Sequence, residues 1–272
     1  MSVKGMDPEE LRKISDNLQG VKNRLLVFSG KGGVGKTTIA VNLAAGLARR
    51  GRKVGLLDID IHGPNVPKML GVENARFELG SGGRIAPVPT PAGVLVVSMA
   101  MLLDNPDTPV VWRGPLKLRA IMQFLGDVSW GELDWLIIDS PPGTGDEPLS
   151  VAQLIPATGA LVVTTPQDVA LLDSRKAVSF ARLLNLKLLG VVENMSGMTC
   201  PHCGQEIALF GTGGGARMAQ ELGVPLLGQV PLDPAIVRGS DAGMPLVLAH
   251  PESKAAAALM KVIDRMIEQE VK

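Results

Sequence analysis

The residues with the most specific chemistry in this chain form a glycine-rich loop near the amino terminus. Residues 30–37 read GKGGVGKT, which matches the pattern G-x-x-x-x-G-K-S/T in full. Glycines at these positions let the backbone curl so that successive N–H groups face a phosphate chain. Lys36 would then reach the β- and γ-phosphates, and the Thr37 hydroxyl would bind Mg²⁺. The spacing predicts a nucleotide site formed by Gly30, Lys31, Gly32, Gly33, Val34, Gly35, Lys36 and Thr37.

Acidic residues follow two apolar segments, where a magnesium nucleotide would need carboxylates. Asp58 and Asp60 end one apolar run, and the two-residue period of a strand places both carboxylates on the same side. Asp139 ends a second run, Leu-Ile-Ile at 136–138, in the usual form of a magnesium-binding carboxylate. We expect Asp58 and Asp139 to face Mg²⁺ and Asp60 to orient the attacking water. The stiff loop PPGTGD at 141–146 suits a sensor of the γ-phosphate.

The choice of base depends on a motif that the sequence lacks. A guanine-specific enzyme would be expected to carry N-K-x-D, and this tetrapeptide does not occur. Asn194 follows an apolar run and could contact adenine through its side-chain amide, although asparagine after a strand is also a common turn residue. The sequence therefore favours ATP over GTP, with Asn194 as the candidate adenine contact.

The two cysteines of the chain lie together in the segment TCPHCG, at Cys200 and Cys203. A two-residue gap lets two thiolates bind one metal centre, but a four-thiolate site needs two more. Two copies of the motif across a two-fold axis would supply them, which suits a bridging iron–sulfur cluster. Two alternatives stay open: a zinc ion in the same position, and a dithiol redox pair. The favoured interpretation is a cluster shared by a homodimer.

These residues need a framework of buried strands and covering helices to bring them together. Short apolar runs predict strands at Leu25–Phe28, Val54–Leu57, Val94–Val97, Leu136–Ile138, Ala160–Val163, Leu188–Val192 and Leu226–Val230. Amphipathic stretches predict helices at Lys36–Arg49, Leu116–Leu125, Asp168–Leu184, Ala216–Leu222 and Ser253–Ile267. Continuous apolar strands that alternate with helices indicate an α/β fold, with a mostly parallel sheet and helices on both faces. Glycine- and proline-rich stretches at Gly80–Gly93 and Asn105–Pro109 are expected to leave the sheet.

Composition narrows the class of protein around this site. Lys plus Arg number 27, as do Asp plus Glu, so the formal charge is zero and a nucleic-acid binder, which needs a basic excess, is disfavoured. No segment approaches the roughly 20 apolar residues of a membrane span, and the amino terminus lacks the apolar run of a signal peptide. Two cysteines cannot build a secreted disulfide framework. We expect a cytoplasmic protein with neither a nucleic-acid nor a membrane partner.

Long segments around these residues resemble the Mrp/ApbC group of P-loop ATPases, which are relatives of MinD, ParA and the nitrogenase iron protein. The resemblance extends from Arg24 to about His250 and includes GKGGVGKTT at 30–38, IIDSPPGTGDE at 137–147 and VENMSGMTCPHCG at 192–204. MinD-type and ParA-type proteins lack the cysteine loop, so that loop and PPGTGDE are the specific parts. The resemblance implies a P-loop NTPase domain at 24–272, preceded by a helical extension at 1–23.

The resemblance also implies a function. Members of this group carry iron–sulfur clusters at a dimer interface and transfer them to apo-proteins, with ATP binding or slow hydrolysis controlling release. It implies that Lys31 crosses to the partner's nucleotide, and its pattern adds Thr38 to the nucleotide site. We therefore expect a homodimeric ATPase that uses ATP and Mg²⁺, binds a bridging 4Fe–4S cluster through Cys200 and Cys203, and serves apo iron–sulfur clients. The alternatives are a ParA- or MinD-like positioning switch and a zinc-stabilised ATPase.

Overall fold

A mostly parallel β-sheet runs through the described part of the chain, which covers residues 7–60, 63–80, 83–102 and 114–270 of this computed structural model. Nine described strands form it, in the order β10-β9-β8-β1-β7-β2-β6-β5, and β11 also pairs with β9. The pairs β5–β6 and β9–β10 are antiparallel, and the other pairs in this sheet are parallel. The strands are β1 (Val21–Phe28), β2 (Val54–Asp58), β5 (Val88–Pro89), β6 (Val94–Ser98), β7 (Leu133–Asp139), β8 (Gly159–Thr164), β9 (Leu188–Thr199), β10 (Glu206–Ile207) and β11 (Leu226–Leu232).

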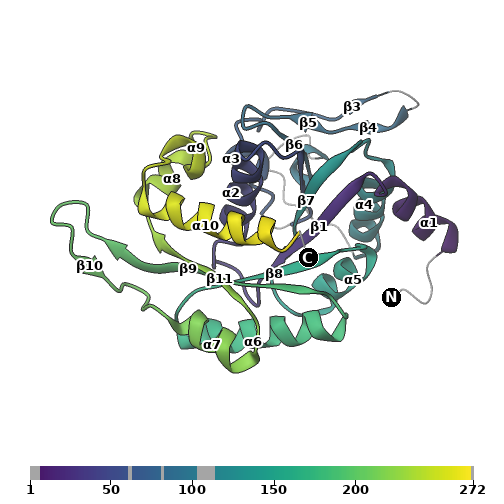
Figure 1. Ribbon diagram of the computed structural model, residues 1–272. Coiled ribbons are helices and arrows are strands. Elements are labelled where there is room, and N and C mark those ends of the chain that lie inside the picture. Colours follow the sequence, from purple (N-terminus) through teal and green to yellow (C-terminus); the bar gives the residue numbers. More distant parts are fainter. Residues whose placement is uncertain (1–6, 61–62, 81–82, 103–113, 271–272) are drawn as a thin grey trace.

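Helices cover both faces of this sheet (Figure 1). One face packs against α2 (Lys36–Arg49), α3 (Val66–Met69), α8 (Pro234–Asp241), α9 (Leu246–Ala249) and α10 (Lys254–Glu268). The other packs against α1 (Pro8–Asn17), α4 (Gly114–Asp127), α5 (Asp146–Leu154), α6 (Asp168–Leu183) and α7 (Gly214–Leu222). This arrangement confirms the predicted α/β fold class.

The central strands are largely apolar where both of their faces are buried. In β1, Leu25 and Val27 belong to the core beneath α2 and α10, whereas Leu26 and Phe28 belong to the core beneath α4 and α6. Successive side chains of a strand point to opposite faces, so two covered faces require apolar residues at every position. Because these strands are parallel, their carboxyl ends lie at one edge of the sheet, where such sheets bind their ligands.

The predicted strands and helices are all present, most with ends within a few residues of those expected. The largest difference is in β9, which was expected to end at Val192 and continues to Thr199. The glycine-rich stretch 80–93 does not leave the sheet completely. Its strand β4 (Ile85–Ala86) pairs with β3 (Glu78–Leu79) in a small separate sheet, but β5 joins the edge of the main one. The stretch 105–109 lies outside the described residues. The remaining described element is the 3₁₀ helix η3 (Met99–Leu102).

The first helix, in the predicted helical extension, has a capped start. Asp7 caps α1 by accepting a hydrogen bond from the backbone N–H of Glu9, and Pro8 occupies the first helical position. Ile14 and Leu18 are buried in the same core as Phe124 of α4. The strand β1 then starts at Val21, ahead of the boundary expected at residue 23. Within the described ranges, no helix combines the length and apolar character needed to cross a membrane.

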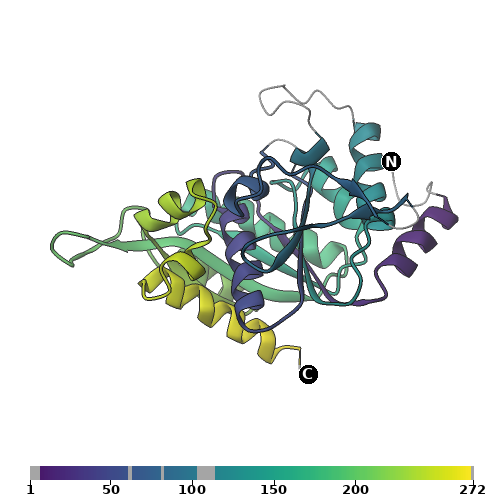
Figure 2. The ribbon, with the colours of Figure 1, turned by 90° about the horizontal axis from the view of Figure 1, so that it is seen from above.

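Beyond the sheet, β9 and β10 form an arm that projects from the body of the molecule, as both views show (Figures 1 and 2). We call residues 197–211 the cysteine arm. Its strands pair at Met198 with Ile207 and at Thr199 with Glu206. At its base, the backbone N–H of Gly197 donates to the carbonyl oxygen of Gly211 at 3.3 Å. The two cysteines lie in the turn at the end of this arm.

Candidate functional site

The phosphate loop connects the carboxyl end of β1 to the first turn of α2. Gly33 and Gly35 both have φ of +80°, a conformation that glycine adopts without a steric penalty. A Cβ atom at Gly32 or Gly33 would meet no heavy atom within 4 Å, so the space outside the loop is open. The loop therefore has the backbone curvature and the open face that a phosphate chain needs.

Gly30 fixes where this loop sits against the rest of the fold. A Cβ atom there would lie 2.2 Å from the backbone carbonyl of Asp173 in α6, a contact that no side chain tolerates. The hydroxyl of Ser29 also donates to the carbonyl oxygen of Lys31 at 2.9 Å. The first glycine of the motif thus serves a packing role in addition to the phosphate contact predicted from the sequence.

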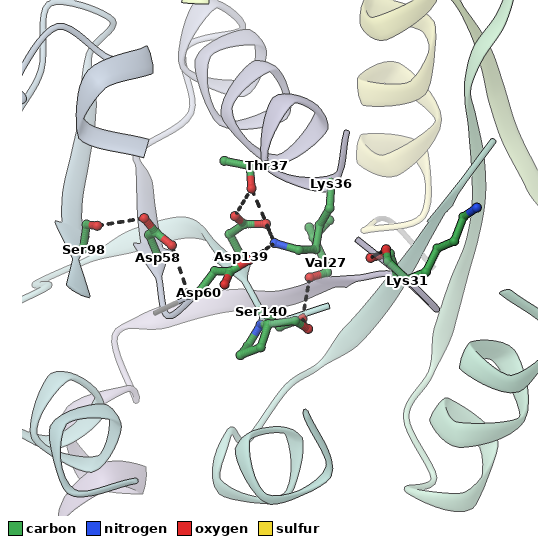
Figure 3. A network of polar contacts seen from close by, with 11 residues as sticks. Val27, Lys31, Lys36, Thr37, Asp58, Asp60, Ser98, Asp139 and Ser140 are labelled. Carbon is green, nitrogen blue, oxygen red and sulfur yellow. Dashed lines mark hydrogen bonds and ion pairs between the residues drawn. The ribbon is translucent and has the colours of Figure 1, made fainter. Parts of the chain in front are cut away.

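Lys36 and Thr37 meet the predicted acids at the edge of the sheet (Figure 3). Lys36 Nζ lies 2.7 Å from Asp139 Oδ1 and 3.5 Å from Asp60 Oδ2. The Thr37 hydroxyl donates to Asp139 Oδ2 at 2.7 Å. The Lys36 side chain is 6% exposed and that of Asp139 is fully buried, so this ion pair is shielded from water. The structure brings together the lysine, hydroxyl and carboxylates that a magnesium nucleotide requires.

Asp58 lies beside Asp139 because their strands are neighbours and the two residues are register partners in β2 and β7. Its Oδ2 accepts a hydrogen bond from Ser98 Oγ at 2.7 Å, and its Oδ1 accepts one from the backbone N–H of Asp60 at 3.1 Å. Burial and the charge of Asp139 raise the pKa of Asp58 to about 8. Burial also raises the pKa of Asp139, against the opposing effect of Lys36. Two such carboxylates favour a divalent cation, which stabilises both charges.

The loop after β7 contacts the carboxyl end of β1 and the residue that precedes the phosphate loop. The Ser140 hydroxyl donates to the carbonyl oxygen of Val27 at 2.9 Å. The backbone N–H of Gly143 donates to the carbonyl oxygen of Ser29, also at 2.9 Å. Gly143 has φ of +100°, and Gly145 precedes the first turn of α5. The loop is therefore positioned to follow changes at the phosphate loop, as a γ-phosphate sensor would be.

Lys31 differs from Lys36 in direction. Figure 3 shows its side chain extending away from the cluster around Lys36 and Asp139. It is half-buried and forms no ion pair with any residue that the structure describes. Its expected contact with a partner's nucleotide stays a prediction.

Asn194 of β9, which is distant in the sequence, contacts the phosphate loop. Its Nδ2 donates to the carbonyl oxygen of Val34 at 2.9 Å, and the residue is only 4% exposed. A Cβ atom on Gly35 would lie 2.2 Å from the same nitrogen, so the fourth glycine of the motif makes room for this amide. The contact with the loop was not foreseen from the sequence, and the adenine contact stays a prediction.

The cysteine arm presents its two thiols on the surface. Cys203 is exposed and Cys200 is half-buried. Two backbone hydrogen bonds stabilise the turn between them. The N–H of Cys200 donates to the carbonyl oxygen of Gln205, and the N–H of Gly204 donates to the carbonyl oxygen of Cys200. Backbone N–H groups of Cys203 and His202 donate to the Cys200 sulfur and lower its pKa. This favours the thiolate, the form that binds metals.

The metal-binding capacity of this turn is limited to the two thiols of one chain. No set of three or more His, Cys, Asp or Glu side chains in the described ranges is arranged to hold a metal ion. A four-thiolate site therefore needs ligands from outside this chain.

One residue near the arm was not singled out from the sequence. Glu193 is fully buried at the end of the apolar run of β9, and its carboxylate accepts hydrogen bonds from backbone N–H groups at the start of α7. This contact explains part of the glycine-rich segment at 211–215, because a Cβ atom on Gly215 would lie 2.9 Å from Glu193 Oε2. An acidic residue inside an apolar strand, followed by a distant glycine-rich helix start, is the signal that points to such a contact.

Known proteins are similar in sequence to this chain over most of its length. The family described as "ParA: NUBPL iron-transfer P-loop NTPase" matches residues 20–267. An iron-sulfur cluster carrier protein of Saccharolobus solfataricus is 51% identical over an aligned length of 273 residues, in an alignment that covers 96% of this chain and 92% of that protein. The human cytosolic Fe-S cluster assembly factor NUBP2 is 45% identical over 256 residues, 93% of this chain and 94% of that protein.

Solved structures agree with the fold. A nucleotide-binding protein from Archaeoglobus fulgidus, solved in complex with ADP, is 38% identical with a TM-score of 0.77 and covers 86% of this chain and 91% of its own. The cell division ATPase MinD of Pyrococcus furiosus is 27% identical with a TM-score of 0.64, covering 91% and 99%. The match over residues 20–267 and the identity near 50% with full-length relatives lead to one conclusion: the chain belongs to the NUBPL-type iron-transfer P-loop NTPases.

Proposed function

We propose that this chain is a homodimeric ATPase that assembles iron–sulfur clusters and transfers them to apo-proteins. The observation that carries the proposal is the presence of two separate sites in one chain of this family. A buried lysine–carboxylate cluster lies at the phosphate loop, and an exposed cysteine pair lies at the end of an arm. The first has the chemistry for a magnesium nucleotide, and the second has half the ligands of a cluster.

At the phosphate loop, each side chain has a definite task. Lys36 exchanges its ion pair with Asp139 for the β- and γ-phosphates, and Lys31 of one protomer reaches the nucleotide of its partner. Thr37, Asp58 and Asp139 would hold Mg²⁺, which supplies charge stabilisation for phosphoryl transfer when it is bound. Asp60, 3.5 Å from Lys36 Nζ, orients the attacking water, and Asn194 contacts adenine. Thr38 lies one residue further along α2.

At the arm, the cluster is cargo. Cys200 and Cys203 of each protomer supply two thiolates, so two arms supply the four that a 4Fe–4S cluster takes. Because the turn is exposed, an apo-protein with its own thiolates has access to the same cluster. Exchange of thiolate ligands would then move the cluster to the client, and the ATP state of the dimer would control when the two arms separate.

Anaerobic reconstitution with iron and sulfide tests the cluster site. We expect the wild type to take up about four irons per dimer, with the absorbance of a cluster, and Cys203→Ala to take up almost none. His202→Ala is the matched control, because it changes the same turn without removing a thiol, and it should load as the wild type does.

Two results would overturn the proposal. In the first, the wild type binds no more iron per dimer than Cys203→Ala. In the second, it binds zinc tightly and develops no sulfide-dependent absorbance, which would support a zinc-stabilised ATPase. A monomeric wild type after loading would contradict the shared site in particular.

A further inference from the structure

In addition to the Gly197–Gly211 hydrogen bond, a buried carboxylate connects the residues that flank the cysteine arm. Glu193 lies just before the arm, and the Ser196 hydroxyl on the outgoing strand donates to its Oε1. After the arm, the backbone N–H of Gly213, the residue that precedes the first turn of α7, donates to the same oxygen at 2.8 Å. Gln229 Nε2 of β11 adds a third donor at 2.9 Å. One carboxylate therefore joins the two ends of the arm and the adjacent strand.

The other oxygen of Glu193 binds α7. Its Oε2 accepts from the backbone N–H of Gly215 and, at 3.3 Å, from that of Ala216. The positive end of the helix dipole favours a carboxylate here. Burial raises the pKa of Glu193, but the donated hydrogen bonds outweigh it and the net pKa is lowered. The carboxylate is thus held ionised between the arm and a fixed helix.

The next residue faces the opposite side of the sheet and contacts the phosphate loop. Asn194 Nδ2 donates to the carbonyl oxygen of Val34, and a Cβ atom on Gly35 would lie 3.6 Å from Met195 Cε. Neighbouring residues of β9 therefore contact two different parts of the molecule. Glu193 contacts the base of the arm, whereas Asn194 and Met195 contact the phosphate loop.

Between these contacts and the arm, β9 bends. Met195 has φ of +56°, a conformation that is uncommon for a residue other than glycine. The pairing with β11 is irregular at this point, because three residues of β9 (195–197) lie opposite one residue of β11, Pro231. A bulge of this kind redirects a strand, and here it sets the direction in which the arm leaves the sheet.

We propose that Glu193 is a positioning residue that makes the cysteine arm follow the phosphate loop. It holds the arm base to the bend at Met195, so a shift of Val34 and Gly35 when a nucleotide binds is carried through Asn194 to the arm. The inference rests on the proposed function and deepens it, since it assigns a path within one protomer from the ATP site to the cluster-binding thiols.

Amide hydrogen exchange of the full-length, metal-free protein with and without MgADP tests this path. In the wild type we expect MgADP to slow exchange both in the phosphate loop, at 30–37, and in the arm, at 197–211. In Glu193→Gln the protection of the phosphate loop should persist, while the protection of the arm by MgADP should fall at least tenfold. Gln cannot accept backbone N–H groups through both of its terminal atoms.

Glu206→Gln is the matched control, because it makes the same chemical change on β10, at an exposed position inside the arm. It should respond to MgADP as the wild type does. The conservative change Glu193→Asp keeps the charge and should restore part of the arm response. If Glu193→Gln does not fold, Ser196→Ala, which removes one donor to the carboxylate, should reduce the arm response by a smaller factor.

Three outcomes would overturn the inference: no response of the wild-type arm to MgADP, an unchanged arm response in the folded Glu193 and Ser196 variants, or an equal loss in Glu206→Gln. Iron is absent from the experiment, so the failure of the cluster site does not affect it. If MgADP does not slow exchange at residues 30–37 of the wild type, this result would instead refute the nucleotide site of the proposed function, and this inference with it.

Discussion

The phosphate loop and the cysteine arm belong to the same sheet, but they are built in opposite ways. The phosphate loop has an open outer face, but the side chains behind it are enclosed by the same chain. Its lysine and carboxylates are buried and paired with one another, and Gly30 and Gly35 are in close contact with α6 and Asn194. The cysteine arm extends away from the body, and one of its thiols is exposed. Within the described residues, the arm offers two thiols as metal ligands, and no third His, Cys, Asp or Glu side chain is arranged with them.

This difference separates two kinds of binding site. The phosphate loop holds its charges in place before any ligand arrives, as a preorganised site does. Under the proposed function, the cysteine arm supplies half of a site, and a second molecule completes its ligand set. The first site is therefore expected to depend on single buried residues, and the second to depend on assembly.

The largest expected effect is on ATP hydrolysis. Replacing Lys36 with Ala removes the charge at the transferring phosphoryl group and should lower kcat by about 100- to 1000-fold. Lys31→Ala should lower kcat by a similar factor but change ADP affinity much less, because ADP lacks the γ-phosphate. Steady-state hydrolysis and ADP titration of the two variants measure both effects.

Mixing the two variants sharpens this contrast. In a mixed dimer the Lys31→Ala protomer keeps Lys36 in its own loop and receives Lys31 from its Lys36→Ala partner, so one of the two sites is complete. Hydrolysis by the mixture should exceed that of either variant alone. Additive rates in the mixture, or full activity of Lys31→Ala by itself, would place Lys31 outside the partner's site.

The next effect concerns pH and the buried acids. The pKa of Asp58 is raised from 3.8 to about 8, so between these values the folded protein holds a proton that the unfolded chain has lost. The unfolding free energy must then fall as pH rises through this window, by at most ~1.4 kcal/mol per unit. Urea unfolding of the nucleotide-free protein from pH 5 to 8 should show this decrease.

The substitution Asp58→Asn separates the two roles of this residue. An amide can accept from the N–H of Asp60 and donate to Ser98, so the variant should be more stable than the wild type at pH 8 and should vary less with pH. It should also bind magnesium nucleotide more weakly. A variant with the same pH dependence as the wild type would show that Asp58 does not titrate in this range.

The smallest effect compares one hydrogen bond from each region. Ser140→Ala removes a buried bond to Val27 and should lower the unfolding free energy by about 1 kcal/mol. Thr199→Val, in the arm, removes an exposed hydrogen bond that Lys254 of α10 donates, and it should lower the unfolding free energy by no more than about 0.5 kcal/mol. Urea midpoints of the two variants measure the difference. Equal costs would contradict the contrast between an enclosed loop and an exposed arm.

Much of the nucleotide site could be predicted because its residues are tied to local patterns. The glycines and lysine of the loop occur in a contiguous motif, and Asp58 and Asp139 follow apolar runs, so their positions at strand ends follow from the alternation of strands and helices. The parallel sheet then brings the strand ends together without further information.

The contacts that could not be predicted join residues that are distant in the sequence. The hydrogen bonds from Ser98 to Asp58 and from Asn194 to Val34 depend on which strands are neighbours. An apolar pattern does not specify strand order. The extension of β9 to Thr199 was missed because polar residues and a glycine interrupt the apolar run after Val192, and its last two residues pair with the two-residue strand β10 and with Leu232 of β11. Glu193 was missed because a buried carboxylate is recognised only from its donors.

The closed base of the arm has a consequence for how such a protein can vary. The chain enters and leaves the arm at Gly197 and Gly211, which are joined by one backbone hydrogen bond, and the sheet core does not pass through the arm. Loops with adjacent ends and few buried contacts tolerate changes in length and composition. The composition and length of the arm can therefore change without altering the sheet core or the phosphate loop.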